Sequence, residues 1–407
     1  MARLLRSLKR RLNPPSDETT RMAELAPDSK PVGRVLLSYA TRVWEELLAG
    51  KGIHNRHPAA WHNFQTARTF LDLGFAVDVV WYNNPRLRPA HEYDAVYDVG
   101  HALERLSSRV GPNTLRIYSP DFAHWTAQNS RTLARVSALR ERRGIVLDPG
   151  RVVPMQRSAE SAQQMLFRGG PWSQQTYAHV EAPIHLLPQF TGQLLAAAPE
   201  RRDDVRHRFI WLSGGGVVHK GLDLVLEAFA RNPQLELDVF GDVEREQRFF
   251  EAYRHELTEL PNIRLRGFVD TAGSDFAEAV SRAVALVHPS CCEVTCTAVI
   301  AGMAGGLIPI ATASTDIELD GLGLEVRDDT VEAVEAALLT ATSMPTQELA
   351  AMSEAARAAA MTRYGRDRFL DGLRGTLSEL LGVEPAPVWD EPESLRVPGI
   401  RIVQAPT

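Results

Sequence analysis

Short apolar runs alternate with longer amphipathic segments through most of this chain. Residues 32–38 form an apolar run, residues 59–73 carry apolar positions at helical spacing and end at Gly74, and residues 76–81 form a second apolar run. Runs of this length predict buried strands, and a strand, a helix and a strand in succession predict one unit of a parallel sheet. Further strands are predicted at 94–99, 115–118 and 184–187.

The alternation starts again after a polar, charged segment at residues 199–206. We place a domain boundary there, because boundaries fall in exposed segments that few contacts cross. The second half has predicted strands at 209–213, 235–240 and 263–266, and predicted helices at 244–257, 297–305, 331–340, 352–363 and 366–381.

These patterns predict an α/β protein with two Rossmann-like, doubly wound parallel-sheet domains that face each other across a cleft. The expected divisions are a basic or disordered segment at 1–31, an N-terminal Rossmann-like domain at 32–200, a C-terminal Rossmann-like domain at 201–363, a last helix at 364–382 and a Pro-rich tail at 383–407.

Composition narrows the possible partners. The 407 residues are 44% hydrophobic and 24% charged, with a net charge of −6, which is typical of a globular protein and argues against nucleic acid as the main partner. No apolar stretch approaches the roughly 20 residues of a spanning helix. Residues 3–12 alternate arginine and lysine with leucine, which predicts either a short helix on anionic lipid or a solvated tail. We therefore expect a cytoplasmic protein, with peripheral contact at the inner membrane face as an alternative.

Residues 286–312 read as strand, loop, helix and strand. An apolar run ends at His288, a short loop carries Glu293 and Thr295, and a helix of small residues follows from about Thr297. Backbone N–H groups at a helix start suit a diphosphate, and Glu293 lies where the hydroxyls of a bound sugar could reach it.

All three cysteines of the chain lie in this loop. With His288, the residues Cys291, Cys292 and Cys296 give a spacing that invites a zinc interpretation, although a second pair of ligands is absent from the sequence. The alternative is that they are small residues packed in a tight turn. A thiol at a helix N-terminus would have a lowered pKa and react with thiol reagents.

The loop and helix resemble the donor-binding signature of the family 4 (group 1) glycosyltransferases. The matching residues are Pro289, Ser290, Glu293, Met303, Ala304, Gly306 and Pro309. Upstream, residues 211–229 are similar to the first strand and phosphate-contacting loop of that family. The resemblance implies the two-domain GT-B fold, a final helix that crosses back onto the N-terminal domain, and a retaining glycosyltransferase of the hexosyltransferase type. It assigns acceptor binding to the domain at 32–200 and nucleotide-sugar binding to the domain at 201–363. It also implies a UDP- or GDP-linked sugar as donor, no cofactor and no divalent metal.

Three positions depart from the signature. Ala301 stands where the family has a second glutamate, which usually holds the nucleotide ribose, and Val294 and Cys296 replace two loop glycines. The chain looks closer to a bacterial subset whose loop reads Ser-Glu-Gly-x-x-Thr-Ser-Val. The departures indicate a variant donor site, with loss of activity as the alternative.

The donor residues follow from the charge that grows on a departing diphosphate. No Asp-x-Asp metal motif occurs in the sequence, so a cation and backbone N–H groups would have to stabilise it. Lys220, after the glycine turn, supplies the cation, and His219 is a weaker candidate. The predicted donor-binding residues are Gly214, Gly215, Gly216, Lys220, Phe268, Val269, Glu293, Thr295, Cys296 and Thr297. A capping role for Glu293 and core packing for Phe268 and Val269 remain alternatives.

The acceptor residues are expected in the N-terminal half. The resemblance implies a histidine after a strand; the matching position is Ser119, and the nearest imidazole is His124, which we take as the catalytic candidate with Lys220 and Glu293. The other acceptor candidates are Trp61, His62, Asn63 and Asp121. Arg131, Arg135 and Arg142 share one face of a predicted helix at 129–144, which is either a solvated face or an anchor for an acidic acceptor.

The sequence thus predicts a metal-independent, retaining glycosyltransferase that builds a bacterial surface glycan or glycolipid on a glycan or lipid-linked acceptor. Two alternatives stay open. One is a catalytically weak relative that binds a sugar nucleotide or a partner transferase without turnover, and the other is a related enzyme acting on the nucleotide sugar itself, such as an epimerase or phosphorylase.

Overall fold

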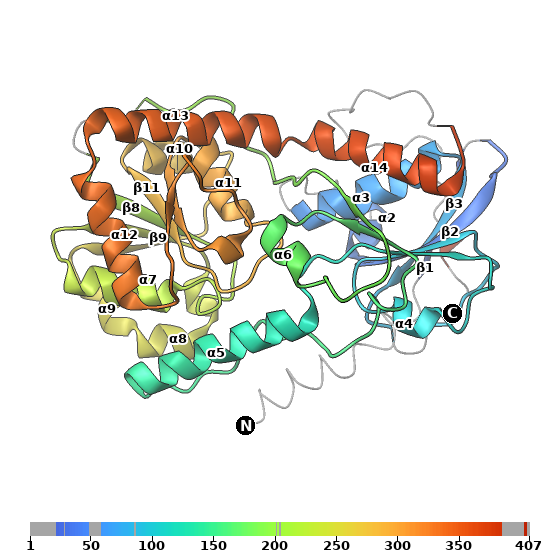
Figure 1. The fold of residues 1–407 in the computed structure, drawn as a ribbon, viewed down its shortest axis with the longest axis horizontal. Coiled ribbons are helices and arrows are strands. Elements are labelled where there is room, and N and C mark those ends of the chain that lie inside the picture. The colour runs from blue at the N-terminus through green and yellow to red at the C-terminus, as the bar shows by residue number, and fades with distance from the viewer. Residues whose placement is uncertain are drawn as a thin grey trace.

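The computed structural model describes residues 22–27, 29–48, 58–84, 87–200, 202, 205–384 and 403–404. Two α/β domains lie side by side, with long C-terminal helices running along one edge of both (Figure 1). The predicted membrane-contacting residues 3–12 lie outside the described residues, and none of the described helices is long and apolar enough to cross a membrane.

The N-terminal sheet has eight strands in the order β14-β1-β3-β2-β4-β5-β6-β7. Strands β2 to β7 are parallel, whereas β1 pairs antiparallel with β3 and with β14. Strand β4 is buried along its whole length and β3 along all but its last residue, as expected for a sheet covered on both faces. The strands are β1 (Met22–Leu25), β2 (Gly33–Tyr39), β3 (Phe75–Trp81), β4 (Ala95–Asp98), β5 (Leu115–Tyr118), β6 (Gln164–Phe167), β7 (Ile184–Leu186) and β14 (Val403–Gln404).

The C-terminal sheet has six parallel strands in the order β10-β9-β8-β11-β12-β13. Numbered within the domain this order is 3-2-1-4-5-6, which is the Rossmann order and puts a topological switch point between β8 and β11. The strands are β8 (Arg208–Leu212), β9 (Glu236–Phe240), β10 (Ile263–Gly267), β11 (Ala285–His288), β12 (Ile308–Ala311) and β13 (Leu324–Glu325).

Helices cover both sheets. In the N-terminal half they are α2 (Arg42–Leu48), α3 (Pro58–Asp72), α4 (Leu103–Leu106), α5 (Trp125–Arg143) and α6 (Pro171–Gln175). In the C-terminal half they are α7 (Leu222–Arg231), α8 (Gln247–Ala252), α9 (Arg254–Thr258), α10 (Ser274–Ser281), α11 (Thr297–Ala304), α12 (Val331–Ser343), α13 (Thr346–Arg363) and α14 (Arg366–Leu381), with short 3-10 turns η1 (Val243–Arg245) and η2 (Ala313–Thr315).

Helix α14 returns to the N-terminal domain. Phe369, Leu373 and Leu377 recur at helical spacing and are fully buried in the N-terminal core. Figure 1 shows α13 along the C-terminal domain and α14 along the N-terminal domain, as one nearly continuous bridge.

Helix α5 leaves the domain to which its sequence position assigns it and packs against the C-terminal domain, with side-chain contacts to α7 and α9 (Figure 1). Leu139 is buried in the C-terminal core, and Arg142 forms ion pairs with Asp223 (2.8 Å) and Glu227 (2.7 Å). Arg135 is also buried and donates to the carbonyl of Pro289. The expectation of a solvated or acceptor-binding arginine face is therefore wrong for Arg135 and Arg142, since both hold the two domains together.

Three further expectations need correction. Residues 22–25, expected to carry no regular element, form strand β1, and residues 403–404 of the expected surface tail form β14. The predicted helix at 244–257 is three short pieces, because the backbone leaves helical geometry at Glu246 and Tyr253. Strand β6 was not predicted. These short elements depend on pairing partners far along the chain, which local periodicity does not reveal.

Candidate functional site

Two loops of the C-terminal domain meet at the switch point of its sheet. Strands β8 and β11 are adjacent, so residues 213–221 after β8 and residues 289–296 after β11 emerge side by side. Ligands of open parallel sheets bind at this place, outside the carboxyl ends of the strands. The glycines of the first loop include Gly215 and Gly216 at positive φ, a conformation that side chains rarely adopt.

Lys220 and Glu293, one from each loop, form an ion pair. Glu293 accepts this contact on Oε1, which also accepts a 2.8 Å hydrogen bond from Ser290. Within the described residues no hydrogen bond to Oε2 is present, so this oxygen is available to a ligand hydroxyl. Burial raises the pKa of Glu293, but Lys220, His219 and Arg151 outweigh it and hold that pKa at about 2. The carboxylate is therefore charged at neutral pH.

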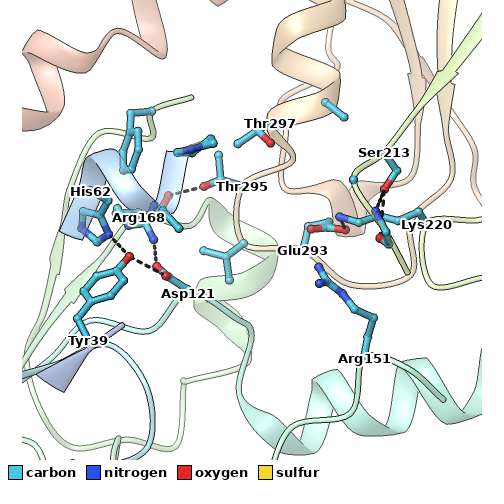
Figure 2. A pocket seen from close by; sticks show the side chains of 17 residues that line it. Tyr39, His62, Asp121, Arg151, Arg168, Ser213, Lys220, Glu293, Thr295 and Thr297 are labelled. Atoms are coloured by element: carbon cyan, nitrogen blue, oxygen red, sulfur yellow. Dashed lines mark hydrogen bonds and ion pairs between the residues drawn. The ribbon is translucent and has the colours of Figure 1, made fainter. Parts of the chain in front are cut away.

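This ion pair lies in a cavity of about 410 Å³ between the domains. Figure 2 shows Lys220, Glu293 and Ser213 on one side and Tyr39, His62, Asp121 and Arg168 on the other, with Thr295 and Thr297 between them. The volume lies within the usual range for small-ligand sites, roughly 300–1,000 Å³. The first turn of α11 also lines the cavity, through Thr297 and Ala298.

Arg151 adds a second cation that the sequence analysis missed. It lies in the long connection after α5, and its guanidinium points toward Glu293 (Figure 2). The backbone of the connection is held to α5. Gln128 donates to the carbonyl of Arg151 (2.9 Å), and the Asn129 side chain forms hydrogen bonds with both the backbone N–H and the backbone carbonyl of Val153. No motif surrounds Arg151, so only its position in the fold reveals it.

The N-terminal wall carries a connected polar network. Tyr39 contacts His62 Nδ1 at 2.9 Å and donates to Asp121 at 3.2 Å, and Asp121 forms an ion pair with Arg168 (Figure 2). Burial, reinforced by the charge of Arg168, lowers the pKa of His62 well below its usual value, so the imidazole is neutral. The sequence analysis named Asp121 and His62 but not Tyr39 or Arg168.

A second cavity, of about 390 Å³, continues from the first past Ser213, Gly214 and Thr297. Phe268 and Val269, the predicted base-contacting residues, line it. The Phe268 residue is 75% exposed, so core packing does not explain it, whereas Val269 is largely buried in the C-terminal core. An exposed ring beside an apolar cavity suits stacking of a planar ligand.

His124, the predicted catalytic histidine, lies outside these cavities. It is buried at the start of α5, within 3.4 Å of Glu160. Trp61 and Asn63, two further acceptor candidates, do not line the cavity, because helix α3 turns both into the core. Trp61 packs on Phe190 and Phe369, and Asn63 bonds Trp44 and Ala40. Of the five acceptor candidates, His62 and Asp121 therefore reach the cavity.

Three residues predicted for the donor loops, Gly216, His219 and Cys296, do not line the first cavity. Cys296 is buried beneath the loop and does not line the cavity, and Gly216 instead donates its N–H to Glu246. Burial lowers the pKa of His219 to about 4, so it is neutral and supplies no cation. It contacts Thr132 of α5 at 3.0 Å and the carbonyl of Cys292, which ties α5 to the signature loop.

The three cysteines are buried packing residues. Burial raises the pKa of the Cys291 and Cys296 thiols to about 12, which contradicts the expected activation by the helix N-terminus. Among the described residues, His288 and the cysteines do not form a metal-ligand cluster. Ala301, at the place of the second glutamate, is buried in an apolar cluster.

Comparisons with known proteins agree with this architecture. Residues 206–343 match the family model described as Glycosyl transferases group 1. A search of curated proteins gave no match. The fold resembles sucrose-phosphate synthase from Thermosynechococcus elongatus, with a TM-score of 0.59 and 13% identity over 87% of this chain and 100% of that chain.

Two other solved structures are similar over most of their length. For HepE of Anabaena in complex with UDP and glucose, the TM-score is 0.53 and the identity 13% over 86% of this chain and 99% of that chain. For WaaG, a glycosyltransferase involved in lipopolysaccharide biosynthesis, the values are 0.50 and 13% over 85% and 99%. These neighbours confirm the predicted GT-B fold. Residues 206–343 of this two-domain GT-B chain, which include both Lys220 and Glu293, are thus the part that is similar to the group 1 glycosyltransferases.

Proposed function

We propose that this protein is a glycosyltransferase that moves a sugar from a nucleotide-sugar donor to a hydroxyl of an acceptor bound by the N-terminal domain. The observation that carries the proposal is the ion pair of Lys220 and Glu293. These residues are 73 positions apart and meet inside an interdomain cavity, at the switch point where parallel sheets bind ligands.

Two cationic side chains and the N-terminus of helix α11 are available to bind the departing diphosphate. Lys220 has three N–H donors, so it can bind phosphate oxygens while it remains paired with Glu293. Arg151 adds a planar guanidinium that suits phosphate, and the first turn of α11 adds backbone dipole. Because these groups can stabilise the developing charge without a metal ion, we propose metal-independent transfer with UDP or GDP as the leaving group.

Glu293 is proposed to orient the donor sugar. Its Oε1 is occupied by Lys220 and Ser290, which fixes the carboxylate and leaves Oε2 to accept from a sugar hydroxyl. The second cavity extends from the diphosphate region toward Phe268, where the base would stack. With Ala301 in an apolar environment, ribose binding by a carboxylate at that position is not part of the proposal.

The acceptor is proposed to approach the wall formed by Asp121 and His62. A third cavity of about 270 Å³ shares Asp121, Arg151 and Glu293 with the first and extends along this wall. We propose retention of configuration by attack from the face of the leaving phosphate, which requires no nucleophilic side chain. A bacterial surface glycan or glycolipid as product is supported by the fold shared with WaaG and by the basic residues 3–12.

The alternative is a relative that binds a sugar nucleotide without turnover. Ala301 favours it, because a ribose ligand of the related signature is missing and the surrounding apolar cluster offers no replacement at that position. The two functions make the same prediction for nucleotide binding and differ in product formation.

Calorimetry with UDP and with GDP tests the donor site. Lys220→Gln should weaken binding of the preferred nucleotide by roughly 10–150-fold, the equivalent of one charge-assisted contact of about 1.5–3 kcal/mol. Lys30→Gln, at an exposed lysine, is the matched control and should bind normally. Circular dichroism checks that both variants are folded.

A donor screen read by mass spectrometry then tests turnover. Transfer or donor hydrolysis at equal rates with and without added Mg²⁺ or Mn²⁺ supports the proposal. Nucleotide binding without any product supports the non-catalytic alternative, and failure of both nucleotides to bind removes the donor site altogether.

A further inference from the structure

His124, Glu160 and His179 come together away from the interdomain cavities. They belong to three separate segments of the N-terminal domain: the start of α5, the turn at residues 158–161 and the segment after α6. His124 Nε2 lies 3.4 Å from Glu160 Oε1, and His179 Nε2 lies 3.5 Å from the same oxygen. The nearest ligand atoms of all three lie within 4.8 Å of one another.

These separations fit a bound zinc ion. Zinc takes nitrogen and carboxylate ligands at about 2.0–2.2 Å in tetrahedral geometry, so two ligand atoms lie roughly 3.3–3.5 Å apart. Both contacts to Glu160 have this length, which is longer than a normal hydrogen bond between such groups. The two rings are almost perpendicular, with centroids 4.4 Å apart, so their Nε2 atoms can approach one point without the rings stacking.

The burial and the unpaired Nε2 of His124 are independent indications of a bound cation. Its residue is 3% exposed, and within the described part of the chain its Nε2 has no hydrogen-bond partner. Its Nδ1 contacts Thr126 Oγ1 at 2.8 Å, the type of outer contact that fixes the tautomer of a metal-binding histidine. With the proton on Nδ1, the Nε2 lone pair faces a carboxylate, an arrangement that a cation between them would stabilise.

The cluster is open to solvent on one side. The side chain of His179 is 50% exposed and that of Glu160 is 27% exposed, so an ion can reach the cluster from solvent and a water molecule can complete its coordination.

We propose that His124, Glu160 and His179 form a binding site for a transition-metal ion, with Zn²⁺ as the best fit, and that its role is structural. Imidazole ligands favour zinc and its neighbours over Mg²⁺ and Ca²⁺. None of the three residues lines the cavities of the proposed donor and acceptor sites, so the ion takes no part in sugar transfer.

The site would stiffen a contact between the domains. Helix α6, which leads to His179, receives Asp316 of the C-terminal domain at its N-terminus, where the N–H groups of Gly170 (2.6 Å) and Trp172 (3.0 Å) donate to the carboxylate. Thr176, at the end of α6, donates its hydroxyl to the carbonyl of Ser173. The same Oγ1 accepts a hydrogen bond from the backbone N–H of His124, which links α6 to the start of α5. A metal ion held by His124 and His179 would fix the start of α5 and the segment after α6 relative to each other.

The experiment uses the full chain after EDTA treatment and removal of the chelator. Zn²⁺ binding is measured by competition with a chromophoric chelator, and Co²⁺ serves as a spectroscopic probe. We expect one tight site per chain and a higher Tm with Zn²⁺ but not with Mg²⁺. His179→Gln or Glu160→Gln should weaken Zn²⁺ binding by more than the roughly 10–100-fold that loss of an outer contact costs, and Thr126→Val by about that amount.

His255→Gln is the matched control. His255 also pairs with a glutamate, Glu259 at 2.9 Å, but on an exposed helix face where the described residues offer no third ligand, so its loss should leave Zn²⁺ affinity unchanged. His179 and Glu160 are partly exposed, and circular dichroism of the metal-free variants checks their folding. The proposal is overturned if wild type and His179→Gln bind Zn²⁺ equally, or if bound Co²⁺ shows thiolate charge transfer, which would place the ion on the cysteines instead.

Discussion

The two walls of the interdomain cavity are built in different ways. The C-terminal wall consists of two loops that follow adjacent strands, and its ion pair of Lys220 and Glu293 comes from recognisable sequence motifs. The N-terminal wall joins Tyr39, His62, Asp121 and Arg168 from four separate segments, with no motif around any of them. A diphosphate is common to many ligands, so a short recurring loop motif can bind it. An acceptor differs from one enzyme to the next, so the wall proposed to bind it does not need a recurring motif.

Arg151 connects the two walls. It comes from the N-terminal half, yet it points to Glu293 of the C-terminal wall, and its connection is fixed to α5, which itself packs on the C-terminal domain (Figure 2). The proposed donor site therefore depends on both halves of the chain. The comparison predicts that changes in the C-terminal wall affect donor binding, changes in the N-terminal wall affect the acceptor, and Arg151 affects the donor despite its position.

The largest expected effect concerns the charge of Glu293. Its folded pKa of about 2 lies below its ordinary value of 4.5, so the unfolded chain binds more protons between these pH values. The stabilisation is fully present above pH 4.5 and is lost as the pH falls toward 2, on the order of 3 kcal/mol. Urea unfolding across this pH range should show a shallower acid loss for Glu293→Gln than for wild type.

An exposed carboxylate provides the control. Glu259 is largely exposed, so Glu259→Gln should keep the wild-type acid profile. Equal slopes for wild type and Glu293→Gln would contradict the close pairing on which the C-terminal wall depends.

Arg151→Ala should lower kcat/KM for transfer by roughly 10–150-fold and weaken nucleotide binding, because a charge-assisted contact worth about 1.5–3 kcal/mol is lost. Arg245→Ala is the control, since the Arg245 side chain is 82% exposed. Steady-state kinetics and calorimetry provide the two readouts. If Arg151→Ala changed only the KM for the acceptor, the prediction that Arg151 contributes to donor binding would be wrong.

Asp121→Asn should raise the acceptor KM by about 10-fold and leave UDP or GDP affinity unchanged. The substitution weakens the network with Tyr39 and Arg168 in the N-terminal wall, worth about 1.5 kcal/mol for a contact to a charged group. Initial rates at varied acceptor concentration, with calorimetry for the nucleotide, separate the two effects. A change in nucleotide affinity alone would assign Asp121 to the donor.

Phe268→Ala should have the smallest effect. A stacked ring contributes about 0.5–1.5 kcal/mol, so nucleotide affinity should fall roughly 2–12-fold with little change in stability, because the side chain is exposed. Leu339→Ala, at another exposed apolar residue, is the control for nonspecific effects. Unchanged calorimetric affinity for Phe268→Ala would remove the second cavity from the donor site.

Much of the fold could be read from the sequence. Strands β2, β3, β5 and β8 and helices α3, α11 and α14 lie within a residue or two of their predicted positions, because strongly apolar runs and helical spacing are local properties. The short strands β1 and β14 were missed, since each is stabilised by a partner strand distant in sequence. Helix α5 was predicted, but its arginines gave no sign of the domain on which it packs.

The sequence by itself determined the C-terminal half of the site: a glycine turn, Lys220 and Glu293 follow two strands, and parallel strands end at one edge of a sheet. Tertiary structure alone decided which residues complete it. It brought Arg151 and Arg168 to the cavity, turned Trp61 and Asn63 into the core, and moved His124 to the separate cluster with Glu160 and His179. Local spacing fixes which residues share a loop or a face, but the packing of whole domains fixes which faces meet.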